Sequence, residues 1–168
     1  MKFFGKKSVQ PAAPVLSEPM SLRSDTLTFA VGVTQRREIE RSIGPAITYP
    51  AAGWQTWTVA GLRGETWILS AFYRANVLIG VEHYLAKTEN LPRYAPRIKG
   101  LFKLMPVGLG LGSPSTNLPR GFAANGGRLA GVRTVVYGEG FEARWLGGVA
   151  LVGANDGRIE RLAVYGSA

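Results

Sequence analysis

The chain has 168 residues and no cysteine, and its 20 Lys and Arg residues against 11 Asp and Glu residues give a formal net charge of +9. This length suffices for one domain or for two small ones. The absence of cysteine excludes a disulfide framework, a thiolate nucleophile and a zinc site with cysteine ligands. The 22 glycines favour many tight turns over long helices.

Residues 1–27 are predicted to form a flexible arm. Lys2, Lys6 and Lys7 lie at its start, but the apolar run of ~7–15 residues that an export signal needs does not follow them. Prolines among Ser, Glu and Gln then indicate an extended, weakly ordered chain. No stretch approaches the ~18 apolar residues of a membrane span. We therefore expect a cytoplasmic protein. The alternative is a protein peripheral to a membrane, with the lysines beside Phe3 and Phe4 as a weak anchor to the membrane surface.

Residues 28–87 are predicted to form a first unit that begins with a short helix. Thr34 is a suitable N-cap, Ile39 and Ile43 lie four residues apart on one face, and Gly44-Pro45 ends the helix. β-Branched and aromatic residues then predict three strands, the last two paired as a hairpin, over residues 54–59, 67–74 and 77–85.

Residues 88–105 are predicted to form a basic connector. Between residues 91 and 105 the chain has four basic residues and no acidic one, interleaved with apolar side chains. Such a mixture suits a phosphate-rich or anionic lipid surface. The alternative is a linker whose apolar residues pack while its charges stay solvated. The predicted anion-binding residues are Arg93, Arg97, Lys99 and Lys103.

Residues 106–168 are predicted to form a second unit that parallels the first. Ser113-Pro114 is a helix-start signal, since proline is acceptable at the first helical position. Asp156-Gly157 indicates a hairpin turn. Strands are predicted over residues 131–137, 141–152 and 158–165, the second of them broken near Gly147-Gly148. The sequence therefore predicts an α+β protein made of two tandem repeats of a short helix plus an antiparallel β-sheet.

The first unit also carries a pattern shared with a known family. Its order is a Gly-x-Thr turn, a short helix, Ile-Gly-Pro, a Gly-Trp-x-x-Trp strand and an aromatic hairpin. The matching residues are Thr34, Gly44, Pro45, Trp54, Trp57, Phe72 and Val77. This pattern resembles the domain of the small lipoproteins of the outer-membrane assembly machinery. Two copies, over residues 28–86 and 106–166, also resemble the tandem arrangement in the β-lactamase inhibitory proteins.

The resemblance implies a protein-binding scaffold without catalytic apparatus. The chain departs from the lipoproteins in having no lipobox cysteine and no signal segment, and from the inhibitors in having no cysteines that staple the fold.

Residues for catalysis are scarce. His83 is the single histidine, and on a strand its neighbour Glu82 points to the opposite face, so the two cannot cooperate directly. No metal-ligand spacing surrounds His83. The glycine-rich run 108–113 lacks the Gly-Lys-Ser/Thr ending of a phosphate loop. We therefore predict no enzyme activity, no cofactor and no metal.

Aromatic side chains gather between residues 54 and 84. Because side chains alternate along a strand, about half of them face the core of a one-sided sheet. The alternative is that both faces of the sheet are covered. The predicted partner-binding residues are Trp54, Trp57, Trp67, Tyr73 and Tyr84.

The sequence thus predicts a non-enzymatic protein-binding adaptor or assembly subunit that uses aromatic sheet faces. The alternative is a binder of nucleic acid or of an anionic membrane surface through the basic connector and the arm. No oligomeric state is predicted.

Overall fold

The computed structural model describes residues 20–46, 53–87, 98–105, 107–116, 133–137 and 140–167. Strands account for 58% and helix for 7% of this part of the chain, so the protein is mostly antiparallel β-sheet. The strands form two sheets, one of eight strands and one of four. The single helix within the described residues is α1, Arg36–Ile43.

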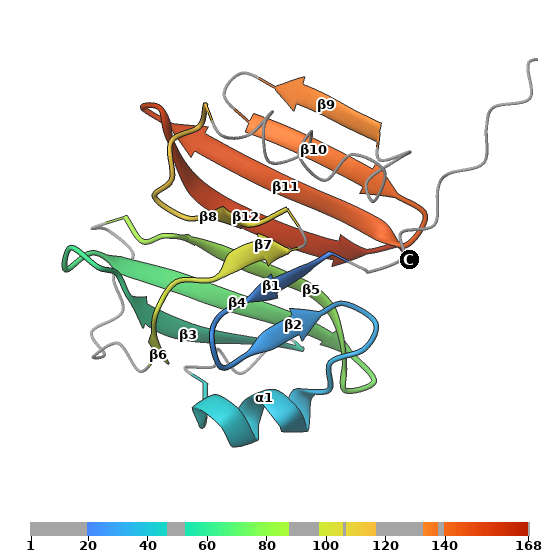
Figure 1. Cartoon of the computed structure of the whole chain (residues 1–168). Coiled ribbons are helices and arrows are strands. Elements are labelled where there is room, and N and C mark those ends of the chain that lie inside the picture. The colour runs from blue at the N-terminus through green and yellow to red at the C-terminus, as the bar shows by residue number, and fades with distance from the viewer. Residues whose placement is uncertain are drawn as a thin grey trace, which may run out of the picture.

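The eight-stranded sheet is built from two meanders that lie side by side (Figure 1). Its strands are, in spatial order, β6 (Ile98–Lys99), β3 (Trp54–Ala60), β4 (Thr66–Arg74), β5 (Val77–Leu85), β12 (Arg158–Gly166), β11 (Gly148–Asn155), β10 (Gly140–Trp145) and β9 (Arg133–Tyr137). Pairing of β5 with β12 joins the two meanders, and all pairs are antiparallel except β3 with β6.

Tight turns set the ends of the long strands. Ala75 and Asn76 have φ angles of 48° and 66°, and Asp156 and Gly157 have φ angles of 49° and 72°. Two consecutive residues with positive φ match the right-handed twist of the strands that such a turn joins. The hairpins β4–β5 and β11–β12 therefore form where the sequence predicted them.

The four-stranded sheet covers one face of the large sheet (Figure 1). Its strands are, in spatial order, β2 (Thr28–Ala30), β1 (Ser21–Arg23), β7 (Lys103–Met105) and β8 (Leu109–Gly110). Thus β1 comes from residues that were expected in the arm, and β7 from residues that were expected in the connector. Leu22, Phe29, Phe102 and Leu104 are fully buried.

We call the face of the large sheet toward the four-stranded sheet the inner face, and the opposite one the outer face. The register aligns one row of inner-face residues across five strands, namely Trp57, Leu69, His83, Leu162 and Val152. All of them are at most 2% exposed. The core therefore lies between the two sheets, where apolar area is removed from water on both sides.

The predicted α+β class with two helix-plus-sheet repeats is wrong. The second helix was expected to start at Ser113-Pro114, but the backbone there pairs with the β11–β12 hairpin. Ile159 N donates to Ser113 O at 2.9 Å, and Ser115 N donates to Gly157 O at 2.8 Å. Pro114 forms an isolated β-bridge with Arg158. Hydrogen bonds to a distant hairpin thus replace those that a first helical turn would make.

The helix α1 begins one residue later than expected. Its N-cap is Gln35, whose N–H donates to the Glu38 carboxylate at 3.1 Å. The Thr34 hydroxyl instead accepts the Ala30 N–H at 2.9 Å. Gly44 ends the helix as predicted, with a φ of 77° that favours glycine.

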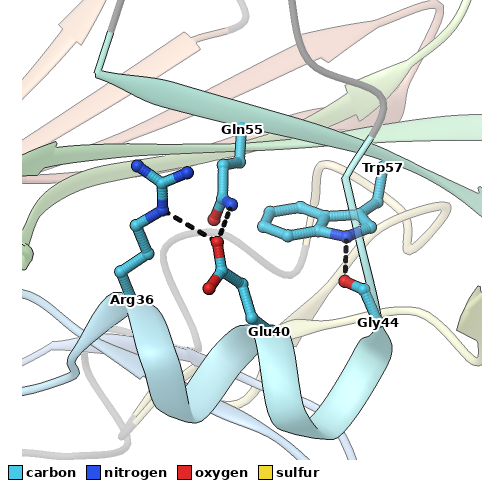
Figure 2. Close-up of polar contacts among 5 residues, drawn as sticks. All are labelled: Arg36, Glu40, Gly44, Gln55 and Trp57. Atoms are coloured by element: carbon cyan, nitrogen blue, oxygen red, sulfur yellow. Dashed lines mark hydrogen bonds and ion pairs between the residues drawn. The ribbon is translucent and has the colours of Figure 1, made fainter.

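Polar contacts fasten α1 to β3 (Figure 2). The Glu40 carboxylate oxygen Oε1 accepts hydrogen bonds from Arg36 Nε at 2.8 Å and from Gln55 Nε2 at 2.7 Å. The Trp57 indole N–H donates to the Gly44 carbonyl at 3.3 Å. The hydrogen bond from Arg36 holds the pKa of Glu40 below its usual value, against the opposing effect of burial.

Replacing Glu40 by alanine should therefore destabilise the fold. The change removes the acceptor of the Gln55 amide, a side chain that is 3% exposed, so Gln55 Nε2 loses its partner. We expect Glu40→Ala to lower the free energy of unfolding by about 1–3 kcal/mol in chemical denaturation.

Glu40→Gln keeps an oxygen that can accept the hydrogen bond from Gln55 Nε2, so it should lower the free energy of unfolding by less. Arg37→Ala, an exposed change on the same helix, should stay within about 0.5 kcal/mol of the parent. Equal stability of Glu40→Ala and Arg37→Ala would show that this contact does not hold the helix.

Candidate binding face

The register of the sheet places three aromatic residues in one row on the outer face. Trp54 on β3 lies opposite Phe72 on β4, and Phe72 lies opposite Gly80 on β5. Gly80 in turn lies opposite Tyr165 on β12. We call Trp54, Phe72 and Tyr165 the aromatic row.

The rings of this row contact each other across four strands. The Trp54 and Phe72 rings are stacked, with centroids 6.1 Å apart and an angle of 5° between their planes. The Phe72 and Tyr165 centroids are 6.4 Å apart. This second contact passes over Gly80, where an added Cβ would come within 2.7 Å of the Tyr165 ring. Glycine is thus the residue that lets these two rings approach.

A hollow of about 490 Å³ borders the row at one end of the strands. Phe72, Tyr165 and the exposed Arg74 line it. The register of β4 and β5 shifts between Phe72 and Tyr73, so that Ile79 is an extra residue in β5. Such a bulge re-aims side chains, and Ile79 lines the hollow while 37% exposed. Apolar groups are therefore presented beside an indentation.

Two ion pairs lie on the described part of the outer face. Arg161 Nη2 lies 3.0 Å from the Glu82 carboxylate, and Arg144 contacts Glu142 on the neighbouring part of the sheet. Tyr84 lies beside Arg161 in the register. The outer face therefore combines aromatic rings with paired charges, as the contact surface for a protein often does.

The structure divides the predicted partner-binding residues between the two sides of the sheet. Trp54 and Tyr84 are half-buried on the outer face. Trp57 and Trp67 are core residues, 1% and 4% exposed. Tyr73 is half-buried beside α1, where the Arg36 guanidinium lies 6.0 Å from its ring centroid.

Sequence reasoning did not assign Phe72, Ile79 and Tyr165 to the site. Phe72 lies on the same face as Trp54 because the two residues are opposite each other in the pairing of β3 with β4, which the sequence alone does not give. The position of Tyr165 depends on the contact between β5 and β12, which are far apart in the sequence. The bulge at Ile79 has no local signal beyond the adjacent Gly80.

Of the predicted anion-binding residues, Lys103 alone has a described side chain. It is exposed on β7, where its register partner is Arg23 on β1. Lys99 lies on β6, but its side chain is outside the described part of the structure. Arg93 and Arg97 also lie outside the described residues.

His83 is a core residue on the inner face. It is fully buried, and its Nδ1 lies 2.9 Å from the Ile68 carbonyl oxygen, to which a protonated Nδ1 donates. Its Nε2 is buried without a hydrogen-bond partner. Its ring packs against Trp67 and Phe102, with centroids at 6.0 and 5.4 Å. Burial lowers the pKa of His83 to about 4, against the opposing effect of the hydrogen bond.

The comparisons with known proteins gave no relative. No family model matches the chain, and neither the curated proteins nor the solved structures gave a significant match. Within the described ranges no three His, Asp or Glu residues are grouped so that they could hold a metal ion. No helix there has the length and apolar character to cross a membrane.

The buried histidine should make stability depend on pH. Because the pKa of His83 is about 4 in the folded chain and near 6.5 when unfolded, the unfolded chain binds a proton first as the pH falls. The free energy of unfolding should therefore decrease as the pH falls from 6.5 to 4, and His83 should cause no further decrease below pH 4. His83→Leu should remove on the order of 3 kcal/mol of that decrease.

The measurement is urea unfolding of both chains at several pH values. The carboxylates titrate in both chains, so the difference in the free energy of unfolding between parent and variant reports the contribution of His83 alone. If this difference stayed constant across pH 4–7, the pKa of His83 would be the same in the folded and the unfolded chain, which would contradict the prediction.

Proposed function

We propose that this chain is a non-enzymatic protein-binding adaptor or assembly subunit that contacts its partner through the outer face of the large sheet. The observation that carries the proposal is the aromatic row beside the hollow at Ile79. Large aromatic side chains next to an indentation are typical of the residues that dominate binding energy at protein interfaces.

The row is suited to binding because its rings are held before a partner arrives. Stacking of Trp54 on Phe72, and of Phe72 against Tyr165, restricts their rotamers. Binding a partner therefore costs less side-chain entropy than it would if these rings were free to rotate. The four-stranded sheet covers the inner face, α1 is fastened to β3 at one edge, and both support the large sheet.

The partner class follows from charge and surface together. A net charge of +9 attracts an acidic protein from a distance. The paired charges Arg161–Glu82 and Arg144–Glu142 leave the contact itself to the aromatic row and to Ile79. We therefore propose an acidic protein partner that presents apolar side chains to the row.

The test is capture of a partner by the immobilised full chain, followed by affinity measurement with that purified partner. Ile79→Glu should weaken binding at least tenfold because it places a negative charge in the hollow against an acidic partner, and the exposure of Ile79 predicts an unchanged melting temperature. Trp54→Ser and Tyr165→Ser should weaken binding as strongly, with some loss of stability.

Leu62→Ser is the matched control, since Leu62 is 91% exposed and lies at the other end of β4. It should bind as the parent does. A captured protein that binds Ile79→Glu and Tyr165→Ser as tightly as the parent would overturn the proposal. So would retention of nucleic acid or lipid alone, released by salt, which would favour a basic surface around Lys103.

A further inference from the structure

The space between the two sheets opens at the end opposite the hollow. The opening is a pocket of about 510 Å³, within the usual size range of small-molecule sites. The turn between β3 and β4 contributes Leu62, Arg63 and Glu65, and the start of β12 contributes Arg158 and Glu160. The remaining wall comes from the ends of β4 and β5 and from residues next to the four-stranded sheet.

The interior of the pocket is apolar. Trp67 and Leu85 lie opposite each other on the inner face of β4 and β5. Leu101, Leu111 and Ile159 complete the wall, and Leu111 and Ile159 are themselves at most 7% exposed. A hydrocarbon chain placed here would remove apolar surface from water on several sides.

Trp67 is held in place as the pocket's aromatic wall. Its indole N–H donates to the Glu65 carboxylate at 3.2 Å, and the other oxygen of Glu65 accepts the Arg63 N–H at 2.8 Å. Burial tends to raise the pKa of Glu65, but hydrogen bonds from its own backbone N–H, from Trp67 and from Arg63, together with the charge of Arg63, outweigh it and leave the pKa below its usual value. Glu65 therefore remains a negative charge beside the pocket.

The rim carries two guanidinium groups. Arg63 and Arg158 are both exposed, and neither forms an ion pair with any residue that the structure describes. The remaining acidic group at the rim is Glu160, which is half-buried. The lining thus has two cationic and two anionic groups, but the guanidinium groups are exposed while both carboxylates are half-buried, so an anionic head group at the opening can accept hydrogen bonds from the arginines.

We propose that this pocket binds a small amphipathic anion, with its hydrocarbon chain between Trp67, Leu85 and Leu111 and its anionic head group at Arg63 and Arg158. The site lies at the opposite end of the strands from the aromatic row, so it is separate from the proposed protein contact. The shared chemistry is a single apolar chain with a terminal carboxylate or phosphate.

The test is a titration of the full-length protein with decanoate, followed by calorimetry and by amide chemical shifts in NMR. Acetate, decyltrimethylammonium and decyl phosphate serve as comparison ligands. Decanoate should bind saturably below its micellar concentration and at least tenfold more tightly than the cation, and acetate should not saturate. The ratio of decanoate to decyl phosphate affinity identifies the preferred head group. Shifts should concentrate at Gly112 and Arg158.

Charge changes at an exposed rim position give variants that will fold. Leu62 is 91% exposed, so Leu62→Asp should weaken decanoate binding about fivefold and Leu62→Lys should strengthen it by a similar factor. Arg63→Gln combined with Arg158→Gln should weaken it tenfold or more. Arg37→Gln, on α1, is the matched control and should not change it.

Three results would overturn the assignment. They are equal binding of decanoate and decyltrimethylammonium, no response to the charge at Leu62, and chemical shifts centred on the hollow at Ile79. Ile79→Glu should leave decanoate affinity unchanged, so failure of this proposal and failure of the protein-binding proposal give different results.

Discussion

The pairing of β5 with β12 is the contact on which the rest of the structure depends. It joins the two meanders through strands that are more than 70 residues apart in the sequence, and it aligns His83 with Leu162 and Val81 with Val164. Because side chains alternate along strands, a shift of one residue at this seam would move the core residues of one meander to the outer face. The same register that fills the core therefore places Tyr165 beside Phe72 on the outer face.

Local signals predicted the strands and turns of the large sheet well. Asp156-Gly157 and Ala75-Asn76 adopt the positive φ angles that end their hairpins, and this depends on neighbouring residues alone. The segment at Ser113-Pro114 was mispredicted because its hydrogen-bond partners, Gly157 and Ile159, lie about 40 residues away. The strand β1 was missed for the same reason, since its three residues pair with Lys103–Met105.

The site was predicted in part because the sequence shows alternation but not which side faces inward. Trp54 and Trp57 are three residues apart, so their opposite orientation follows from the strand period. Which one lies in the core depends on the four-stranded sheet and on Gly44, whose carbonyl accepts the Trp57 indole N–H. The bulge at Ile79 then changes the alternation within β5, which a constant period of two residues cannot predict.

The packed core also separates the two candidate sites. β4, β5 and β12 contribute to both, with Phe72 and Tyr165 at one end and Trp67 and Ile159 at the other. Between them Leu69, His83 and Leu162 are fully buried. Energetic coupling between two sites requires an element with two discrete arrangements that both sites bias. The core row joins the two ends through these three side chains, so a ligand at one end would affect the other only by moving this row.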